Sequence, residues 1–207
     1  MNVITLIPCK NLDRGKSRLA GCLSPRSRRA LCEFFLCRTL DVATAAVGPE
    51  NVRVVTGDPR VATLAAEYGV TAIPDRDADL NDALALGRDH ALAEMGERAG
   101  LILPIDLPLA TAAALARVMA APEAAVIVPD EGADGTNILR LAPAAFRHFR
   151  FAYGPRSYAA HRAQASEIGL GVRSVHDPVL MFDVDTPEQY GRWAEHDPAW
   201  SPGRSSQ

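Results

Sequence analysis

A basic loop directly follows the first apolar segment of the chain. Residues 3–7 are apolar apart from one threonine, and Lys10, Gly15, Lys16 and Arg18 follow soon after. Cations neutralise phosphate oxygens, and a glycine lets backbone N–H groups approach an anion closely. The pattern is therefore typical of a polyphosphate-binding loop, although a solvated basic loop would have the same composition.

The tripeptide Gly15-Lys16-Ser17 is similar to the end of a Walker A motif. That motif requires a second glycine five residues before the first residue of the tripeptide, and the chain has Lys10 there. The P-loop interpretation is therefore excluded.

Three aspartates occur where metal ligands are expected. Asp106 follows the apolar run 101–105, and Asp183 and Asp185 flank Val184. In an extended segment, residues i and i+2 point to one face, so the last two carboxylates would repel each other without a cation between them. Each aspartate alone could instead cap a turn or a helix. The three together favour a site for Mg²⁺, which prefers oxygen ligands.

A second pair of loops could bind an anion. Gly135 precedes Thr136, and Gly154 precedes Ser157 at the expected start of a helix, where backbone N–H groups are unpaired. An ordinary turn and an ordinary helix cap are the alternatives. His161 lies one turn after Ser157, and we interpret it as a surface or packing residue rather than a catalytic base.

The composition is that of a soluble globular protein of one domain. The chain has 207 residues, 48% hydrophobic and 23% charged, with a net charge of −3. This charge does not favour nucleic-acid binding, and no apolar run reaches membrane-spanning length. The four cysteines form no C-x-x-C pair, which is typical of reduced thiols in a cytoplasmic protein. Cys9, beside the basic loop, is expected to be accessible.

Short apolar segments alternate with helical patterns, which predicts an α/β fold with a doubly wound sheet, whose ligands bind beyond the carboxyl ends of the strands. We expect one Rossmann-like domain over residues 1–194 and a flexible tail over 195–207. Strands are predicted at 3–7, 52–56, 71–73, 101–105, 125–129, 137–141, 172–175 and 180–184. Helices are predicted at about 25–46, 59–68, 80–95, 111–120, 155–167 and 186–194.

An ordered set of short motifs resembles one family. The motifs are Pro8-x-Lys10, Lys16-Ser17-Arg18-Leu19, Leu80-Asn81-x-Ala83-Leu84, Asp106-Leu107-Pro108-Leu109, Gly135-Thr136-Asn137-x-Leu139, Gly154-Pro155-x-Ser157-x-x-x-His161 and Asp183-Val184-Asp185-Thr186-Pro187-Glu188. The set, over about residues 3–192, is similar to the 2-phospho-L-lactate/phosphoenolpyruvate guanylyltransferases of coenzyme F(420) biosynthesis. The resemblance implies a fold like that of nucleoside-diphospho-sugar transferases, and transfer of GMP from GTP to a phosphorylated three-carbon acid.

The resemblance also implies roles for residues. Asp106, Asp183 and Asp185 would bind Mg²⁺, and Lys16, Arg18 and Asp106 would be catalytic. The expected nucleotide-binding residues are Pro8, Lys10, Lys16, Ser17, Arg18 and Asn81, the last in a segment near the base. The expected acid-binding residues are Thr136, Gly154, Arg156 and Ser157.

Two positions depart from the family pattern, which has alanine where this chain has Ile138 and glycine where it has Arg156. A cation at position 156 leaves the acceptor open between 2-phospho-L-lactate, phosphoenolpyruvate and 3-phospho-D-glycerate. Another nucleotidyltransferase of the same fold and a non-catalytic GTP-binding module are the alternative functions. The unstable product expected of this chemistry could pass directly to a downstream transferase, and the sequence does not indicate an oligomeric state.

Overall fold

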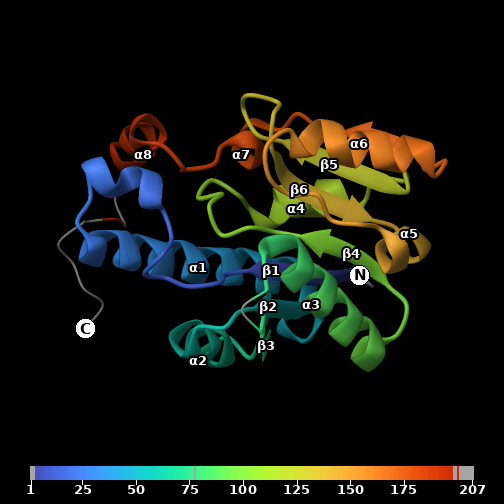
Figure 1. The fold of residues 1–207 in the computed structure, drawn as a ribbon, viewed down its shortest axis with the longest axis horizontal. Helices are drawn as coiled ribbons and strands as arrows, with labels where there is room; N and C mark the ends of the chain where they lie inside the picture. Colours follow the sequence, from blue (N-terminus) through green and yellow to red (C-terminus); the bar gives the residue numbers. More distant parts are fainter. Residues whose placement is uncertain (1–2, 77, 198–199, 201–207) are drawn as a thin grey trace.

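The computed structural model describes residues 3–76, 78–197 and 200. Seven strands form one sheet in the order β3-β2-β1-β4-β6-β5-β7 (Figure 1). The strands are β1 (Val3–Pro8), β2 (Val52–Val55), β3 (Thr71–Ile73), β4 (Ala99–Ile102), β5 (Ala125–Pro129), β6 (Thr136–Leu141) and β7 (Val172–Ser174).

The sheet is mixed. β1 is parallel to β2 and β4, and β2 is parallel to β3, so these four strands end at the same edge. β6 is antiparallel to both β4 and β5. Because β6 runs backwards, its first residue, Thr136, lies at the edge where β4 and β5 end. The predicted α/β class is confirmed.

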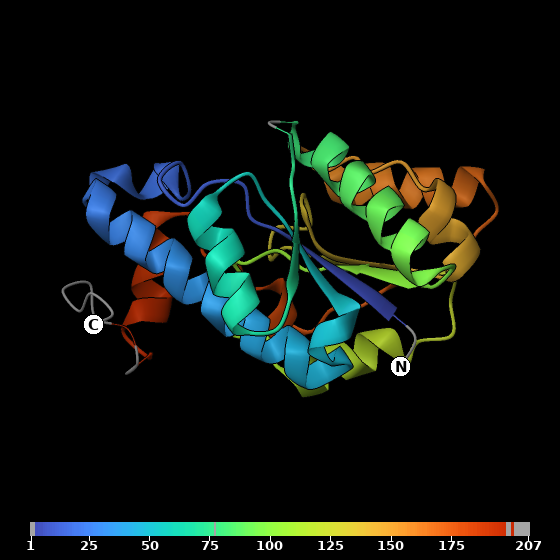
Figure 2. The same ribbon diagram turned by 90° about the horizontal axis from the view of Figure 1, so that it is seen from below.

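Helices cover both faces of the sheet (Figures 1 and 2). The α-helices are α1 (Pro25–Val47), α2 (Pro59–Glu67), α3 (Leu80–Met95), α4 (Ala112–Met119), α5 (Pro143–His148), α6 (Ser157–Glu167), α7 (Pro178–Met181) and α8 (Pro187–Ala194), and η1 (Ser17–Gly21) and η2 (Pro49–Asn51) are 3-10 helices. Helices α1, α2 and α4 pack on one face, and α3, α5 and α6 pack on the other. The alternation along β1 explains both layers, because Val3 and Ile7 join the first cluster and Ile4 and Leu6 the second.

Most helix starts follow from local capping. The side chains of Ser24, Asp58 and Thr186 accept hydrogen bonds from backbone N–H groups in the first turns of α1, α2 and α8. A proline in the first turn of each of these helices lacks an N–H that would otherwise be unpaired. The helix starts predicted at about 25, 59 and 186 are therefore confirmed to within one residue.

A third apolar cluster lies beside the sheet, where α8 packs against η1 and the start of α1 (Figure 1). Phe35 and Trp193 meet at its centre, with ring centroids 4.9 Å apart. Phe182 and Val184 also belong to this cluster. It anchors the segment that carries Asp183 and Asp185.

The strand predicted at 180–184 is wrong. Asp177 accepts a hydrogen bond from the N–H of Val179, and with Pro178 it starts the short helix α7, which ends at Met181. A short apolar run fits a buried helical turn as well as a strand, so its pattern could not decide. Residues 182–184 belong to no strand, although the N–H of Val184 donates to the carbonyl of Asp106 at 3.0 Å.

The strand predicted at 101–105 is shifted in the structure to Ala99–Ile102. Pro104 has no N–H and cannot extend the ladder, whereas Ala99 pairs with Val3 despite its low strand propensity. Tertiary pairing therefore overrides local preference at this strand.

Part of the predicted tail 195–207 lies outside the described residues, namely 198–199 and 201–207. Within the described part, Asp197 pairs with Arg38 at 3.0 Å, and the ring of Trp200 lies 5.4 Å from that of Phe34. The described helices include none with the length and hydrophobicity needed to cross a membrane.

Gly100 generates a stability prediction. A Cβ at this position in β4 would lie 2.1 Å from a ring carbon of Phe146, which packs over the sheet there. We expect Gly100→Ala to lower the free energy of unfolding by about 1–3 kcal/mol, because a packed ring and a central strand must shift. Urea unfolding would measure the loss.

Gly191→Ala in α8 is the matched control, since nothing lies within 4 Å of an added Cβ there. It should leave stability unchanged or raise it by up to about 1 kcal/mol. Equal losses in the two variants would contradict the packing argument.

Candidate active site

A cleft of about 640 Å³ opens at the edge where β1, β2 and β4 end. It is lined by Pro8, Cys9, Lys10, Asn11, Leu12, Arg14, Gly15, Lys16, Cys32, Gly57, Asp75, Leu80, Ile105, Asp106 and Asp185. The predicted basic loop therefore forms one wall, and two of the predicted metal ligands form part of another. This is the edge at which open α/β sheets bind ligands.

The basic loop is held by hydrogen bonds to the sheet and to neighbouring side chains. The N–H of Cys9 donates to the carbonyl of Val55 at 3.0 Å, and the N–H of Leu12 donates to the Asp58 carboxylate at 3.1 Å. Arg28 of α1 donates to the carbonyl of Gly15 at 3.2 Å. The loop is thus tied to β2, to the start of α2 and to α1.

Lys16 is the best-buried cation of the cleft. Its side chain is only 6% exposed, and Nζ lies 3.1 Å from Asp106 and 2.8 Å from Asp185. Burial opposes the charge, but the two carboxylates outweigh burial and raise the pKa of Lys16 above its ordinary value. The lysine therefore stays protonated and joins the two acidic segments.

Asp183 completes the acidic group. Its burial, followed by the nearby charges of Asp106 and Asp185, raises the pKa of Asp183 to about 6. One buried ammonium thus pairs with two carboxylates, while a third lies near enough for their charges to raise its pKa, so the group keeps excess negative charge. Excess negative charge among oxygen ligands is what a divalent cation compensates.

The start of α8 positions both aspartates of this segment. Gln189 forms the capping box with Thr186, and its side-chain oxygen also accepts from the N–H of Asp185 at 3.0 Å. Its side-chain nitrogen donates to Asp183 at 3.2 Å. The cap of α8 therefore also supports the acidic group.

Among the described residues, no three His, Cys, Asp or Glu side chains already converge at metal-binding spacing. The ammonium of Lys16 lies between Asp106 and Asp185 instead. The donor set and the raised pKa of Asp183 nevertheless fit a hard cation such as Mg²⁺. Mg²⁺ binding by Asp106, Asp183 and Asp185 stays a prediction.

The other predicted nucleotide-binding residues have diverse environments. Pro8 lines the cleft, and the ammonium of Lys10 donates to the carbonyl of Ala78 across it. Ser17 is exposed at the start of η1. The exposed side chain of Arg18 lies 3.7 Å from Asp185. Nothing in the structure tests whether these groups bind a nucleotide.

Asn81 of α3 has a role that the sequence did not indicate. Its side-chain oxygen accepts from the N–H of Tyr153 at 2.7 Å, and its nitrogen donates to the carbonyl of the same residue at 3.0 Å. This two-bond contact fixes the backbone just before Gly154. Asn81 therefore connects the helix beside the cleft to the loop of the predicted acid-binding residues, and its contact with a base stays a prediction.

The predicted acid-binding residues do come together. The N–H of Thr136, at the start of β6, donates to Oγ of Ser157, at the start of α6, at 2.9 Å. Gly154 has a φ of +136°, which L residues rarely adopt. Arg156 is exposed in a left-handed conformation with a φ of 58°, and its N–H donates to Asp134 at 3.2 Å.

Asn137 and Tyr153 connect the group around Thr136 and Ser157 with the acidic group. Asn137, next to Thr136, donates to the carbonyls of Leu180 and Met181, just before Asp183. Burial, and then the charge of Asp106, raise the pKa of Tyr153. The predicted acid-binding residues and the carboxylates are thus connected by the hydrogen bonds of Asn137 and by the effect of the Asp106 charge on Tyr153.

Burial decides two interpretations of single side chains. Of the two roles expected for His161, surface or packing residue, the packing role is confirmed, since the side chain is fully buried and both of its ring nitrogens form hydrogen bonds. Cys9, expected to be accessible, is buried, and this burial raises the pKa of its thiol. No signal at either position distinguishes a buried side chain from an exposed one.

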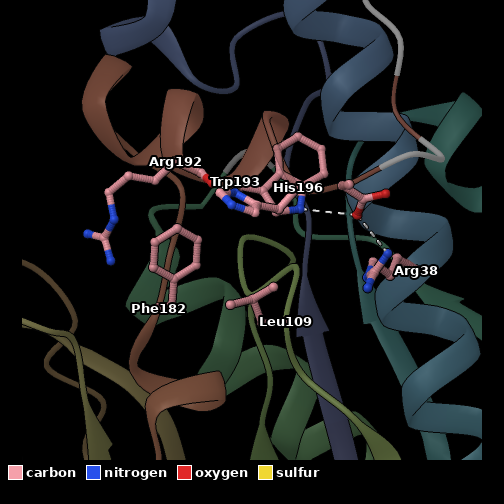
Figure 3. A pocket seen from close by; sticks show the side chains of 7 residues that line it. Arg38, Leu109, Phe182, Arg192, Trp193 and His196 are labelled. Carbon is pink, nitrogen blue, oxygen red and sulfur yellow. Dashed lines mark hydrogen bonds and ion pairs between the residues drawn. The ribbon is translucent and has the colours of Figure 1, made fainter.

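A second cavity, of about 530 Å³, lies outside the cleft, near α8 (Figure 3). Figure 3 shows Arg192 at one side and Arg38 at the other, with Trp193 and Leu109 between them. Arg192 stacks over the ring of Phe182 at 4.9 Å. Both arginines are paired with acids, Arg192 with Glu131 and Arg38 with Asp197, so the cavity offers mainly an apolar lining.

His161 generates a pH-dependent stability prediction. Burial lowers its pKa from 6.5 to about 4, so protonation favours the unfolded chain. The stabilising contribution is complete above pH 6.5 and is lost as the pH falls towards 4, by about 3 kcal/mol. Urea unfolding at pH 7 and pH 4 would measure it.

His161→Gln, which does not titrate, is the control for this loss. Carboxylates that titrate in the same range affect both proteins equally. The difference between the two proteins in the pH dependence of their unfolding free energy therefore reports the imidazole alone. Parallel pH profiles for the two proteins would contradict the prediction.

Comparison with known proteins identifies the family. Residues 2–197 match the family model described as "Guanylyl transferase CofC like". A phosphoenolpyruvate guanylyltransferase of Sphaerobacter thermophilus is 38% identical over 96% of this chain and 95% of its own. One from Rubrobacter xylanophilus is 39% identical over 93% of each chain.

Solved structures agree on the fold. A putative nucleotide-diphospho-sugar transferase from Desulfovibrio desulfuricans superposes with a TM-score of 0.65 and 15% identity, covering 90% of this chain and 84% of its own. A CMP:2-keto-3-deoxy-manno-octonic acid synthetase superposes with a TM-score of 0.61 and 14% identity, covering 94% and 98%. These superpositions show the fold, and the sequence matches show that the chain belongs to the CofC-like guanylyl transferase family.

Proposed function

We propose that this protein transfers the guanylyl group of GTP to phosphoenolpyruvate, or to a similar phosphorylated three-carbon acid, and releases pyrophosphate. The family and its phosphoenolpyruvate guanylyltransferase members support guanylyl transfer. The observation that carries the proposal is the pairing of the buried Lys16 ammonium with Asp106 and Asp185, whose charges also raise the pKa of nearby Asp183. The N–H of Thr136 donates to Oγ of Ser157, which brings together two of the expected acid-binding residues. By the same family relation, we place the reaction in coenzyme F(420) biosynthesis.

The reaction needs no general base. A phosphate oxygen of the acid, already anionic, forms a bond to the α-phosphorus of GTP. The bond from this phosphorus to the oxygen bridging to the β-phosphorus breaks, and pyrophosphate leaves with the electron pair. A buried His161 with both nitrogens in hydrogen bonds agrees with this, because it has no free nitrogen to take a proton.

The side chains of the cleft have separate tasks in this scheme. Asp106, Asp183 and Asp185 would hold Mg²⁺, which supplies positive charge between two anionic substrates. Lys16, with Arg18 and Lys10, neutralises the phosphates and the departing pyrophosphate. Thr136 and Ser157 donate to the acid, whose negative charges would otherwise keep it away from the triphosphate.

Removal of one carboxylate tests the acidic group. We expect Asp106→Asn and Asp183→Asn to lower turnover by roughly 10³-fold, because positive charge is no longer held at the reacting phosphates. Chelation of divalent cations with EDTA should abolish wild-type turnover. Pyrophosphate release from GTP and phosphoenolpyruvate in the presence of Mg²⁺ would be measured, with the downstream transferase and its deazaflavin acceptor present to trap a labile product.

Asp89→Asn, at an exposed position of α3, is the matched control and should leave turnover unchanged. Near-wild-type, Mg²⁺-dependent turnover in Asp106→Asn or Asp183→Asn would refute the assigned metal site.

Arg156 determines which acid is preferred. Its side chain is exposed at the entrance of the acid-binding loops, and its left-handed backbone suits glycine better. We expect Arg156→Gly to raise the KM of acids with an additional polar group, such as 3-phosphoglycerate, more than that of phosphoenolpyruvate. A panel of four nucleotides against phosphoenolpyruvate, phospholactate, 2-phosphoglycerate and 3-phosphoglycerate would measure these preferences.

The same panel tests the overall proposal. Turnover with GTP and one of the acids supports it. Turnover only with another nucleotide points to a different transferase, and GTP binding without any pyrophosphate release points to a non-catalytic module. Equal KM changes for all acids in Arg156→Gly would contradict the selective role of the arginine.

A further inference from the structure

The tautomer of His161 follows from its two hydrogen-bond partners. The N–H of Ala152 lies 3.0 Å from Nε2, and a backbone N–H can only donate, so Nε2 is the acceptor. A neutral imidazole with a bare Nε2 carries its proton on Nδ1. Nδ1 lies 3.0 Å from Oγ1 of Thr136, so the imidazole donates to that hydroxyl.

The surroundings of His161 maintain this neutral form. The side chain is fully buried, and the rings of Tyr153 and Phe149 lie at centroid distances of 4.9 and 5.9 Å. Burial is the cause that lowers its pKa, to about 4. A second ring proton would also point at the N–H of Ala152, where no acceptor is available.

The hydrogen bond from His161 directs the hydroxyl proton of Thr136. A hydroxyl that accepts from one neighbour keeps one proton to donate elsewhere. Oγ of Ser157 is in the same situation, because it accepts from the N–H of Thr136 at 2.9 Å. Both hydroxyls therefore accept from the protein and retain their protons for a ligand.

We propose that His161 is a positioning residue that fixes the Thr136 hydroxyl as a donor, so that Thr136 and Ser157 together bind the oxygens of an anionic group. The pair favours an acceptor-only group such as a phosphate or carboxylate over an amide or an alcohol. The proposal deepens the proposed function, on which the identity of the bound acid rests. The histidine itself touches neither substrate.

A pair of amide substitutions separates the two hydrogen bonds of the ring. The side-chain amide of Asn can replace the Nδ1–H donor to Thr136, whereas that of Gln reaches the position of Nε2 and can replace the acceptor for Ala152. His90→Gln, on the exposed side of α3, is the control for a histidine change elsewhere.

Steady-state kinetics of these variants tests the proposal. We expect His161→Gln to raise the KM of phosphoenolpyruvate by about tenfold and to leave the KM of GTP unchanged, because one donor to the acid is no longer directed. His161→Asn should keep the KM of phosphoenolpyruvate within about threefold of wild type. Equal rises in the two variants, or a larger rise in His161→Asn, would overturn the proposal in favour of a structural role at Ala152.

A double-mutant cycle with Thr136→Val measures the coupling. In the wild type this change should raise the KM of phosphoenolpyruvate by about tenfold. In the His161→Gln background it should add little, because the same donor has already lost its direction. Fully additive effects would overturn the proposed coupling.

The tautomer has a readout that needs no activity. Nitrogen NMR of ¹⁵N-histidine-labelled protein, assigned with His161→Gln, should show Nδ1 protonated and Nε2 bare at pH 7. The opposite tautomer, or a charged ring, would overturn the inference whether or not the protein is a guanylyltransferase.

Absence of turnover in the wild type with every nucleotide and acid would instead refute the proposed function. In that case, calorimetric binding of phosphoenolpyruvate and of inorganic phosphate replaces KM in the comparison. Weaker binding by His161→Gln than by His161→Asn supports the positioning role. Equal binding by the two variants, or no binding by the wild type and both variants, overturns it.

Discussion

The buried ammonium of Lys16 is the contact on which the arrangement of the cleft depends. It connects Asp106, after β4, to Asp185, before α8, and it comes from the loop after β1. Three segments distant in the sequence thus meet at one charge. The charge is costly to bury alone, and the two carboxylates are costly to place together without it. Each therefore makes the position of the others favourable.

The predicted acid-binding residues are held by neutral hydrogen bonds instead. Asn81 fixes the backbone at Tyr153, Ser157 accepts from the backbone of Thr136, and His161 bonds to the hydroxyl of the same threonine. These contacts involve no charged side chain. The structure therefore has a charged group around Lys16 and a neutral, hydrogen-bonded group around Thr136.

The sequence predicted the local features of this fold well, because each depends on neighbours in the chain. Cap and proline pairs such as Ser24-Pro25 and Thr186-Pro187 set helix starts through contacts within one turn. The motifs also predicted that Thr136 and Ser157 act together, and the structure joins them. The strand predicted at 180–184 is wrong because the apolar run there has no periodicity that separates a helical turn from a strand.

What the sequence could not provide depends on contacts between distant residues. The insertion of Lys16 between two aspartates, the reciprocal bonds of Asn81 and the burial of His161 are properties of the packed chain. A lysine in a glycine-containing loop, or a histidine on a helix, has the same local sequence pattern whether its side chain is buried or exposed. The pairing of β1 with β4 brings Asp106 within reach of Lys16, and the reversal of β6 between β4 and β5 brings Thr136, the partner of His161, to the same edge.

The packing of α8 gives the protein an intrinsic optical signal. The chain has two tryptophans, and both Trp193 and Trp200 lie in the aromatic cluster beside the acidic segment. Trp193 belongs to the helix whose cap holds Asp183 and Asp185, and it shares an apolar cluster with Phe182. The tryptophan fluorescence of the molecule therefore originates next to these carboxylates, so that a rearrangement of their segment is visible without any attached dye.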